Sequence, residues 1–173
     1  MSYLFEFTYH NPTQIVFGPN SFAKLGSLVP ADAKVLLLYG GGSIKGNGVY
    51  DRVIAALAGR AVVEFAGVEP NPTLETLSAA VDLAKRQKTD FILSVGGGSV
   101  SDGAKYVACA ALYDGDGWDI VSGRHTPKAA LPVGIVLTLP ATGSESNPAA
   151  VVTRKATHEK RVFYVPPARP RFA

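Results

Sequence analysis

Glycine and hydroxyl residues gather at three places where an apolar, strand-like segment ends. These are residues 40–43 (GGGS), residues 96–99 (GGGS) and residues 138–147 (TLPATGSESN). Glycine has no Cβ, so its backbone N–H groups can approach a phosphate closely, and a helix that follows adds the positive end of its dipole. Repeated turns of this kind at strand ends favour the binding of different parts of one long phosphorylated ligand.

The same turns also have a structural interpretation. Glycine at a strand-to-helix turn is often only a tight corner, and a single GGGS segment would favour that explanation. The second GGGS segment and the third polar turn shift the balance toward a ligand. Neither GGGS segment matches the G-x-G-x-x-G dinucleotide fingerprint or the P-loop with its Gly-Lys-Ser/Thr. The residues by themselves therefore indicate phosphate binding without identifying the molecule.

The sequence contains no catalytic constellation that we can assign. Ser144 lies in GSES, but a nucleophile elbow needs a glycine two residues on either side of its serine, where Thr142 and Ser146 stand. A metal site needs grouped ligands such as an i, i+4 histidine pair. The three histidines are far apart in the sequence, at His10, His125 and His158. We expect no catalytic residue and no metal ligand here, and a phosphotransferase is disfavoured because the P-loop lysine is missing.

Along the chain, apolar segments typical of strands alternate with segments whose apolar residues have helical spacing. Strands are expected over 34–39, 61–65, 91–95 and 134–139, with two later strands over 151–153 and 162–165. Helical stripes begin at Phe22, Val49, Leu74 and Val100. Asn71 and Pro72 suit the cap and first turn of the helix on Leu74, and residues 113–128 are expected to form an exposed connection.

The N-terminal region predicts two short strands. Large apolar residues alternate over residues 3–9, and QIVFG follows at residues 14–18. The first of these strands is a candidate edge for pairing with a second subunit. We therefore predict one α/β domain over residues 1–173, with an open parallel sheet and flanking helices preceded by short N-terminal β-strands.

Composition narrows the class of protein. The 173 residues are 47% hydrophobic, enough for one real core, and the formal net charge is +3. No Lys/Arg run exceeds two residues, so a nucleic-acid partner is not expected. Cys109, the only cysteine, lies among alanines and valines and is expected in the core of a protein from a reducing compartment. The chain shows neither an export leader nor a membrane-spanning run, which favours the cytoplasm.

Four segments carry a resemblance to a known family. They are YGGGSIKGNGVYD, EPNPTLETL, FILSVGGGSVSDGAKYVA and VLTLPATGSESNPAAVVTRKATHEK. Together they resemble the N-terminal domain of the iron-containing (group III) alcohol dehydrogenases, most of all the branch of NADPH-dependent aldehyde reductases and butanol dehydrogenases. The resemblance implies a dehydroquinate synthase-like N-terminal fold and hydride transfer between NADP(H) and a small aldehyde or alcohol.

The resemblance also assigns cofactor-binding residues, position by position. The adenosine ribose end falls to Gly40, Gly41, Gly42 and Ser43, and the pyrophosphate region to Gly96, Gly97, Gly98, Ser99 and Asp102. The diphosphate and nicotinamide half falls to Thr138, Leu139, Thr142 and Ser144, with Lys160 near the nicotinamide ribose and Asn71 beside the cofactor.

Some of these residues have a purely structural alternative. Ser99 can serve only as a helix N-cap. Asp102 can simply suit the positive end of a helix. Lys160 lies in THEKR and can be a solvated turn lysine. These alternatives stay open at the level of the sequence.

The first glycine turn favours NADP(H) over NAD(H). Proteins that bind NAD usually place a carboxylate after an early strand, where it accepts the ribose hydroxyls and would repel a 2′-phosphate. Residues 39–43 (YGGGS) contain no acid and offer backbone amides and a hydroxyl instead.

The family resemblance implies a metal that this chain does not supply. Family members hold a divalent ion, iron or zinc, through one aspartate and three histidines of a helical domain that follows the cofactor domain. The ending FYVPPARPRFA departs from the family pattern, so we expect the helical domain to be absent and the chain to be truncated and inactive alone. The alternative is a non-enzymatic nucleotide-binding module or an inactive fragment. The resemblance also implies a homodimer through the N-terminal strand.

Overall fold

A parallel sheet forms the centre of the computed structural model, which describes residues 6–173. Its strands are β1 (Lys34–Tyr39), β2 (Ala61–Phe65), β3 (Phe91–Gly96) and β4 (Val133–Leu137), in the order β2-β1-β3-β4. All neighbours are parallel. The predicted open parallel sheet is therefore confirmed. The central strands β1 and β3 are almost wholly buried, because helices cover both faces.

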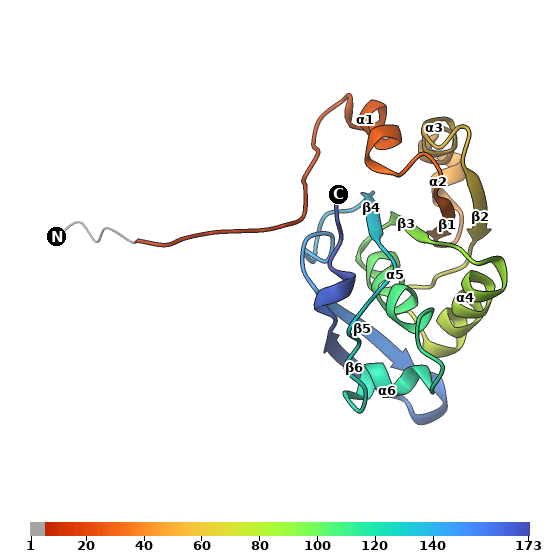
Figure 1. Cartoon of the computed structure of the whole chain (residues 1–173), viewed down its shortest axis with the longest axis vertical. Coiled ribbons are helices and arrows are strands. Elements are labelled where there is room, and N and C mark those ends of the chain that lie inside the picture. The colour runs from red at the N-terminus through yellow and green to blue at the C-terminus, as the bar shows by residue number, and fades with distance from the viewer. Residues whose placement is uncertain (1–5) are drawn as a thin grey trace.

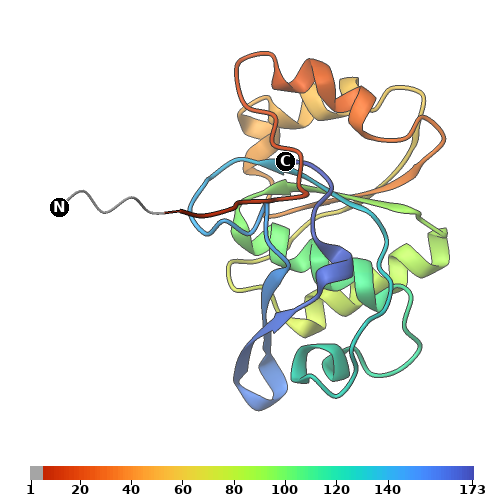
Figure 2. The ribbon, with the colours of Figure 1, turned by 60° about the vertical axis from the view of Figure 1, so that its left-hand side comes forward.

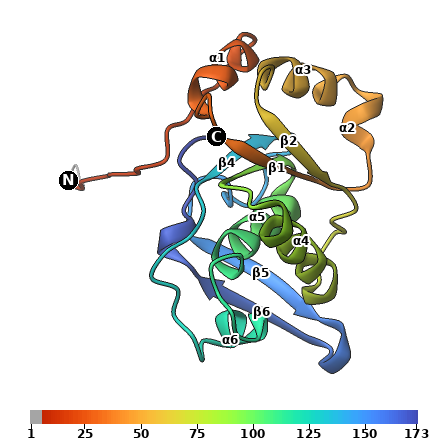
Figure 3. The same ribbon diagram turned by 45° about the vertical axis from the view of Figure 1, so that its right-hand side comes forward.

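Helices cover the two faces in two groups (Figure 3). The helices α1 (Ser21–Leu28), α2 (Ser43–Gly46) and α3 (Val49–Ala56) pack on one face, and α4 (Leu74–Gln87) and α5 (Gly98–Ala110) pack on the other. Parallel connections are right-handed, so a connection toward β2 and one back toward β3 must place their helices on opposite faces. The direction of winding thus reverses between β1 and β3.

An antiparallel hairpin forms a further layer beyond α5. It consists of β5 (Ala149–Arg154) and β6 (Glu159–Tyr164), joined by the short 3-10 helix η1 (Lys155–Thr157). Figure 2 shows this hairpin on the far side of α5 from the sheet. Ala150, Val152 and Phe163 bury their side chains in the same core as α4 and α5. The two predicted late strands are confirmed, but β5 extends beyond the predicted residues 151–153 at both ends, and β6 begins three residues before and ends one residue before the predicted residues 162–165. The chain then turns through η2 (Pro166–Ala168).

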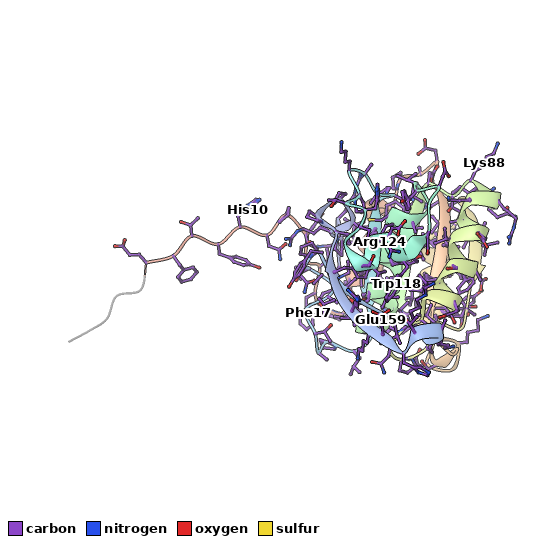
Figure 4. All side chains as sticks on the ribbon, turned by 90° about the horizontal axis from the view of Figure 1, so that it is seen from below. His10, Phe17, Lys88, Trp118, Arg124 and Glu159 are labelled. Atoms are coloured by element: carbon purple, nitrogen blue, oxygen red, sulfur yellow. The ribbon has the colours of Figure 1, made fainter. Side chains whose placement is uncertain are left out.

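The prediction of an exposed connection over residues 113–128 is wrong for the middle of this segment. It contains the helix α6 (Gly117–Ser122), whose Trp118, Ile120 and Val121 are buried. Asp116 caps this helix, because its side chain accepts a hydrogen bond from the Trp118 N–H. Six residues are too few to display a helical period, which is why the sequence pattern missed the helix. The Arg154 guanidinium of the hairpin lies 5.6 Å from the centroid of the Trp118 ring, and Figure 4, seen from below, labels Trp118 together with the hairpin residue Glu159.

The prediction of N-terminal strands fails over the residues that the structure describes. Residues 6–13 are not in a strand, and Gln14 forms only an isolated parallel bridge to Phe172, which in turn bridges Gly134 of β4. Residues 3–5 of the predicted first strand lie outside the described part. Figures 1 and 4 show residues 6–12 running away from the body, with Phe7 and Tyr9 exposed. A segment with alternating apolar residues forms a strand only when a neighbouring strand pairs with it. No such strand lies beside this segment within residues 6–173.

The start of α4 differs from the expectation as well. Thr73, not Asn71, is its N-cap, and its side chain accepts a hydrogen bond from the Thr76 N–H. Asn71 instead has a positive φ of 55°, a conformation that asparagine tolerates better than most residues. Cys109 is buried as predicted, and burial raises its pKa to about 12. Within residues 6–173, none of the helices has both the length and the apolar character needed to traverse a bilayer.

Candidate functional site

The three polar turns lie at one edge of the sheet. Tyr39 at the end of β1 pairs with Val95, and Gly96 at the end of β3 pairs with Leu137 of β4, so these strands end at nearly the same level. Residues 40–43 and 97–99 therefore flank the point where the winding reverses, and residues 138–147 follow on the next strand. In open α/β sheets, ligands bind outside the carboxyl ends of the strands at this reversal point.

The connection after β2 reaches the same edge. The Gly67 N–H donates to the Gly40 carbonyl at 3.0 Å, and the Val68 N–H donates to the Tyr39 carbonyl at 3.2 Å. Further along this connection, the Asn71 N–H donates to Ser99 Oγ at 3.4 Å. Asn71, which the family resemblance places beside the cofactor, is thus brought to the second glycine turn.

The hairpin adds Lys160 to this group. Thr153 of β5 donates its N–H to the Pro72 carbonyl at 3.0 Å, and Thr153 lies opposite Lys160 in the hairpin. This register places Lys160 Nζ 2.7 Å from Asn71 Oδ1, in an exposed hydrogen bond. Lys160 is therefore fixed at the edge of the site, and it also lies on the wall of a cavity of about 650 Å³ between β6 and the residues after α6.

The glycines differ in what a side chain would meet. A Cβ on Gly98 would lie 2.6 Å from Thr142 Oγ1, and one on Gly96 would lie 2.6 Å from Val100 Cγ2. The packing of the chain alone explains these two glycines. A Cβ on Gly41 would meet nothing within 4 Å, and one on Gly97 would meet only Leu139 Cβ at 3.8 Å. The space beside these two glycines is therefore open to solvent or to a ligand.

The second glycine turn opens helix α5, which has 13 residues. Gly97 is its N-cap, so Ser99 lies inside the first turn and the alternative role of Ser99 as N-cap is wrong. The first N–H groups of a helix have no acceptor within the helix, and they carry the positive end of its dipole. Gly98 and Ser99 supply such N–H groups at the sheet edge, an arrangement suited to an anion.

Asp102 and Ser144 contact each other. Ser144 Oγ donates to Asp102 Oδ1 at 2.5 Å, and Asp102 Oδ2 accepts the Val151 N–H at 3.0 Å. Both carboxylate oxygens therefore bind protein groups, and Ser144 is buried. The geometry shows that Asp102 ties residues 144 and 151 to α5. Contact of either residue with a cofactor remains a prediction.

Lys105 completes this network, and the sequence reasoning missed it. Its side chain is fully buried, and Nζ donates to the Ser144 carbonyl at 2.9 Å, to Ser144 Oγ at 2.7 Å and to the Asn147 carbonyl at 3.3 Å. Nζ also contacts the Ala149 carbonyl, and it lies 3.7 Å from Asp102 Oδ1. A signal was present in the sequence: a lysine three residues after Asp102 interrupts an otherwise small and apolar helix.

Burial sets the protonation of this pair. Burial lowers the pKa of Lys105 from 10.5 to about 8, against the opposing effect of the nearby Asp102 carboxylate. Burial likewise raises the pKa of Asp102, although the hydrogen bond from Ser144 and the charge of Lys105 counteract it. Lys105 therefore still carries its proton at neutral pH and releases it near pH 8.

The third turn leaves its first residues open to solvent. The Thr138 N–H donates to the Gly96 carbonyl at 2.9 Å, which extends the β3–β4 pairing by one step. Leu139 is 66% exposed, and Thr142 packs its side chain against Gly98. The predicted strand over 134–139 thus ends two residues early, at Leu137. Leu139, which lies beside Gly97 of the second glycine turn, gives this edge an exposed apolar side chain.

The first turn has its own polar surroundings. Gly42 has a φ of 100°, which favours glycine, and Ser43 opens the short helix α2 in an exposed position. The nearby Glu64 carboxylate accepts hydrogen bonds from Tyr39 OH at 2.8 Å and Tyr50 OH at 2.6 Å. Lys45 Nζ lies 3.8 Å from it. These bonds, mainly the one from Tyr50, lower the pKa of Glu64.

Metal ligands do not come together in the part of the chain that the structure describes. Across residues 6–173, no three His, Cys, Asp or Glu side chains are placed to hold one ion. His125 instead stacks on Tyr113 with ring centroids 4.0 Å apart. The donor set for iron or zinc therefore does not fit within these residues, and we derive no step through a metal from them.

Comparisons with known proteins agree with this geometry. Residues 12–173 match the family model for iron-containing alcohol dehydrogenase. The chain is 52% identical over 171 residues both to the NADPH-dependent aldehyde reductase YqhD of Escherichia coli and to a probable NADH-dependent butanol dehydrogenase of Bacillus subtilis. Each match covers 97% of this chain and 44% of the relative. The chain thus spans less than half the length of these relatives.

Solved structures show the same likeness. The NADH-dependent butanol dehydrogenase A of Thermotoga maritima superposes with a TM-score of 0.92 at 47% identity, covering 96% of this chain and 43% of that structure. The crystal structure of YqhD from Escherichia coli K-12 gives a TM-score of 0.92 at 51% identity, covering 97% of this chain and 44% of that one.

Proposed function

This chain belongs to the iron-containing alcohol dehydrogenase family, and on that premise we propose that it forms the NADP(H)-binding part of a metal-dependent alcohol dehydrogenase or aldehyde reductase. Such an enzyme transfers a hydride between NADPH and a small aldehyde or alcohol. The observation that carries the proposal is the meeting of residues 40–43, 97–99 and 138–147 at the point where the sheet reverses its winding.

We assign one part of the cofactor to each turn. The adenosine ribose binds at Gly40 to Ser43, where the open space beside Gly41 admits it. The pyrophosphate binds at the start of α5, where Gly97 leaves room and the N–H groups of Gly98 and Ser99 face an anion. NADPH, when bound, supplies the hydride. The residues of this chain bind and orient it.

The nicotinamide half then extends along the third turn. Leu139 offers an apolar surface, and Lys160 and Asn71 offer polar groups at the rim. The buried network of Asp102 and Ser144 supports this wall from behind. The residues assigned to the adenosine, pyrophosphate and nicotinamide parts thus lie one after another along the carboxyl edge of the sheet.

A preference for NADP(H) over NAD(H) is part of the proposal. The relatives described above include an NADPH-dependent and a probable NADH-dependent enzyme, so the preference must come from this chain's own residues. Residues 39–43 contain no acid. Glu64, the neighbouring carboxylate, is hydrogen-bonded by Tyr39 and Tyr50 and lies beside the Lys45 ammonium, which reduces its repulsion of a 2′-phosphate.

The metal, the substrate pocket, the dimer and the cellular location belong to the same proposal. The divalent metal, iron or zinc, and most of the substrate pocket belong to the part of the family's length that this chain does not span. A homodimer through the N-terminal segment is supported by the exposed side chains of Phe7, Tyr9, Ile15 and Phe17. The buried, unpaired Cys109 agrees with a cytoplasmic location.

Titration of the purified chain with NADPH and with NADH, followed by nicotinamide fluorescence, tests the proposal. We expect saturable binding of NADPH with a dissociation constant lower than that for NADH. Equal or tighter binding of NADH would refute the preference, and the absence of binding by either cofactor would refute the proposed function itself.

A further inference from the structure

We propose that Lys105 is a positioning residue, which fixes the loop of residues 138–147 against α5 so that this loop can form the wall for the diphosphate and nicotinamide half of the cofactor. The inference rests on the proposed function and deepens it. Lys105 itself lies behind the wall and has no exposed surface.

The contacts of Lys105 are concentrated on one end of the loop. Its Nζ reaches the Ser144 carbonyl, Ser144 Oγ, the Asn147 carbonyl and Asn147 Oδ1, and just beyond the loop it reaches the Ala149 carbonyl. An ammonium group has only three protons, so these acceptors share them. Acceptors on residues 144, 147 and 149 are gathered around a single charge, and together they define the path of the chain into β5.

The other end of the loop is held separately. The Thr138 N–H pairs with the Gly96 carbonyl, and Thr142 packs on Gly98. Between these points, residues 138–142 are exposed. Their position therefore depends on anchors at both ends, and the anchor on the β5 side is centred on Lys105.

The chemistry of the site explains why a charge is used. A buried ammonium loses its hydration, so a buried lysine is a weak choice for stability and a better choice for fixing one arrangement. Asp102 and Glu145 favour the charge, whereas Arg169 opposes it. An apolar residue would fill the same space, but it would bind none of the carbonyls. We infer that the charge determines where the loop lies.

Lys105→Met keeps most of the side-chain volume and removes the charge, so it is the direct test. Lys85→Met is the matched control, because Lys85 contacts the Tyr113 carbonyl and Asp114, away from the loop. We expect hydrogen exchange in residues 138–147 to accelerate in Lys105→Met and to stay unchanged in Lys85→Met. Affinity for NADPH is expected to fall about tenfold in the first variant only.

Adenosine 2′,5′-bisphosphate separates positioning from a general loss of structure. This probe carries the adenosine half of the cofactor and lacks the nicotinamide half, so it should bind Lys105→Met as well as it binds the unaltered chain. Unchanged affinity for NADPH in this variant would overturn the inference. An equal loss for both ligands would also overturn it, because it would indicate general disruption.

Asn147→Ala covers the case in which Lys105→Met fails to fold. This substitution removes Asn147 Oδ1, which accepts hydrogen bonds from Lys105 Nζ and from the Ala149 N–H, and leaves the charge in place. It should accelerate exchange in the same loop and weaken NADPH more than adenosine 2′,5′-bisphosphate. Failure of the unaltered chain to bind NADPH would refute the proposed function and the cofactor part of the inference, whereas the exchange comparison would still decide whether Lys105 anchors the loop.

Discussion

Lys160 Nζ donates a 2.7 Å hydrogen bond to Asn71 Oδ1, which joins the outer strand of the hairpin to the turn before α4. Both residues are exposed, and neither belongs to the hydrophobic core. Exposed polar pairs contribute little to stability. The contact of Asn71 with Ser99 brings this pair to the second glycine turn, where we propose that it binds the cofactor.

Substitution of Lys160 should therefore affect binding and leave stability intact. We expect Lys160→Met to weaken NADPH binding at least about tenfold, because the proposed charge-assisted hydrogen bond to the ribose would contribute roughly 1.5–3 kcal/mol. The free energy of unfolding should change by less than about 0.5 kcal/mol. Fluorescence titration and urea denaturation measure the two quantities. Lys155→Met, on the adjacent turn, is the control. An equal loss of affinity in both variants would indicate a nonspecific effect of charge.

Gly41→Ala tests whether a ligand fills the space beside the first turn. A Cβ at this position meets nothing within 4 Å, and its φ is not among the positive ones. The substitution should stabilise the chain by about 0.4–1 kcal/mol, because alanine restricts the unfolded state. It should nevertheless weaken NADPH several-fold. Gly46→Ala adds the same methyl group in equally open space three residues beyond the turn and should leave affinity unchanged. Unaltered NADPH binding by Gly41→Ala would contradict the proposal that the adenosine end binds at this turn.

Gly98→Ala is expected to behave differently. Its Cβ would lie 2.6 Å from Thr142 Oγ1 and 3.2 Å from Thr142 Cγ2, so Thr142 must move. We expect a loss of about 1–3 kcal/mol in the free energy of unfolding, as for other overpacked sites. Adding Thr142→Ala, which removes both Oγ1 and Cγ2, should recover part of it. If Gly98→Ala alone is neutral, the packing explanation for this glycine is wrong.

The sequence pattern was sufficient for the sheet and insufficient for its surroundings. The strands β1 and β3 are mainly apolar runs, each followed by a glycine turn, so their type and direction could be predicted. The helix α6 is too short for a period. The alternating segment before residue 12 has no neighbouring strand within the described chain, and alternation by itself does not show whether a partner exists.

The site was predictable in part for a similar reason. Glycine turns at strand ends are local in sequence, and parallel topology brings them together. The contacts of Lys105 with Ser144 and of Asn71 with Lys160 join residues 39 and 89 positions apart. Such pairings depend on how the hairpin packs on α5, which no local pattern describes. Thr73 displaced Asn71 as the cap of α4 because Asn71 was already committed to a left-handed turn.

The pKa of Lys105 leads to a dependence of stability on pH. Its folded value, about 8, is below the ordinary 10.5, so between these values the unfolded chain binds more protons than the folded chain. Stability contributed by this residue must therefore rise as pH increases from 8 to 10.5. The rise is at most about 3–4 kcal/mol, since the two values differ by about 2.5 pKa units and each unit corresponds to about 1.4 kcal/mol.

Lys105→Met isolates that contribution, because methionine does not titrate. Urea denaturation of both proteins at pH 7, 8, 9 and 10 gives the difference in the free energy of unfolding at each value. We expect the unaltered chain to gain on the variant steadily above pH 8 and the difference to be flat below it. A difference that falls with pH would mean that the folded state raises the pKa of Lys105, so that its contacts with Ser144, Asn147 and Asp102 outweigh the cost of burying its charge.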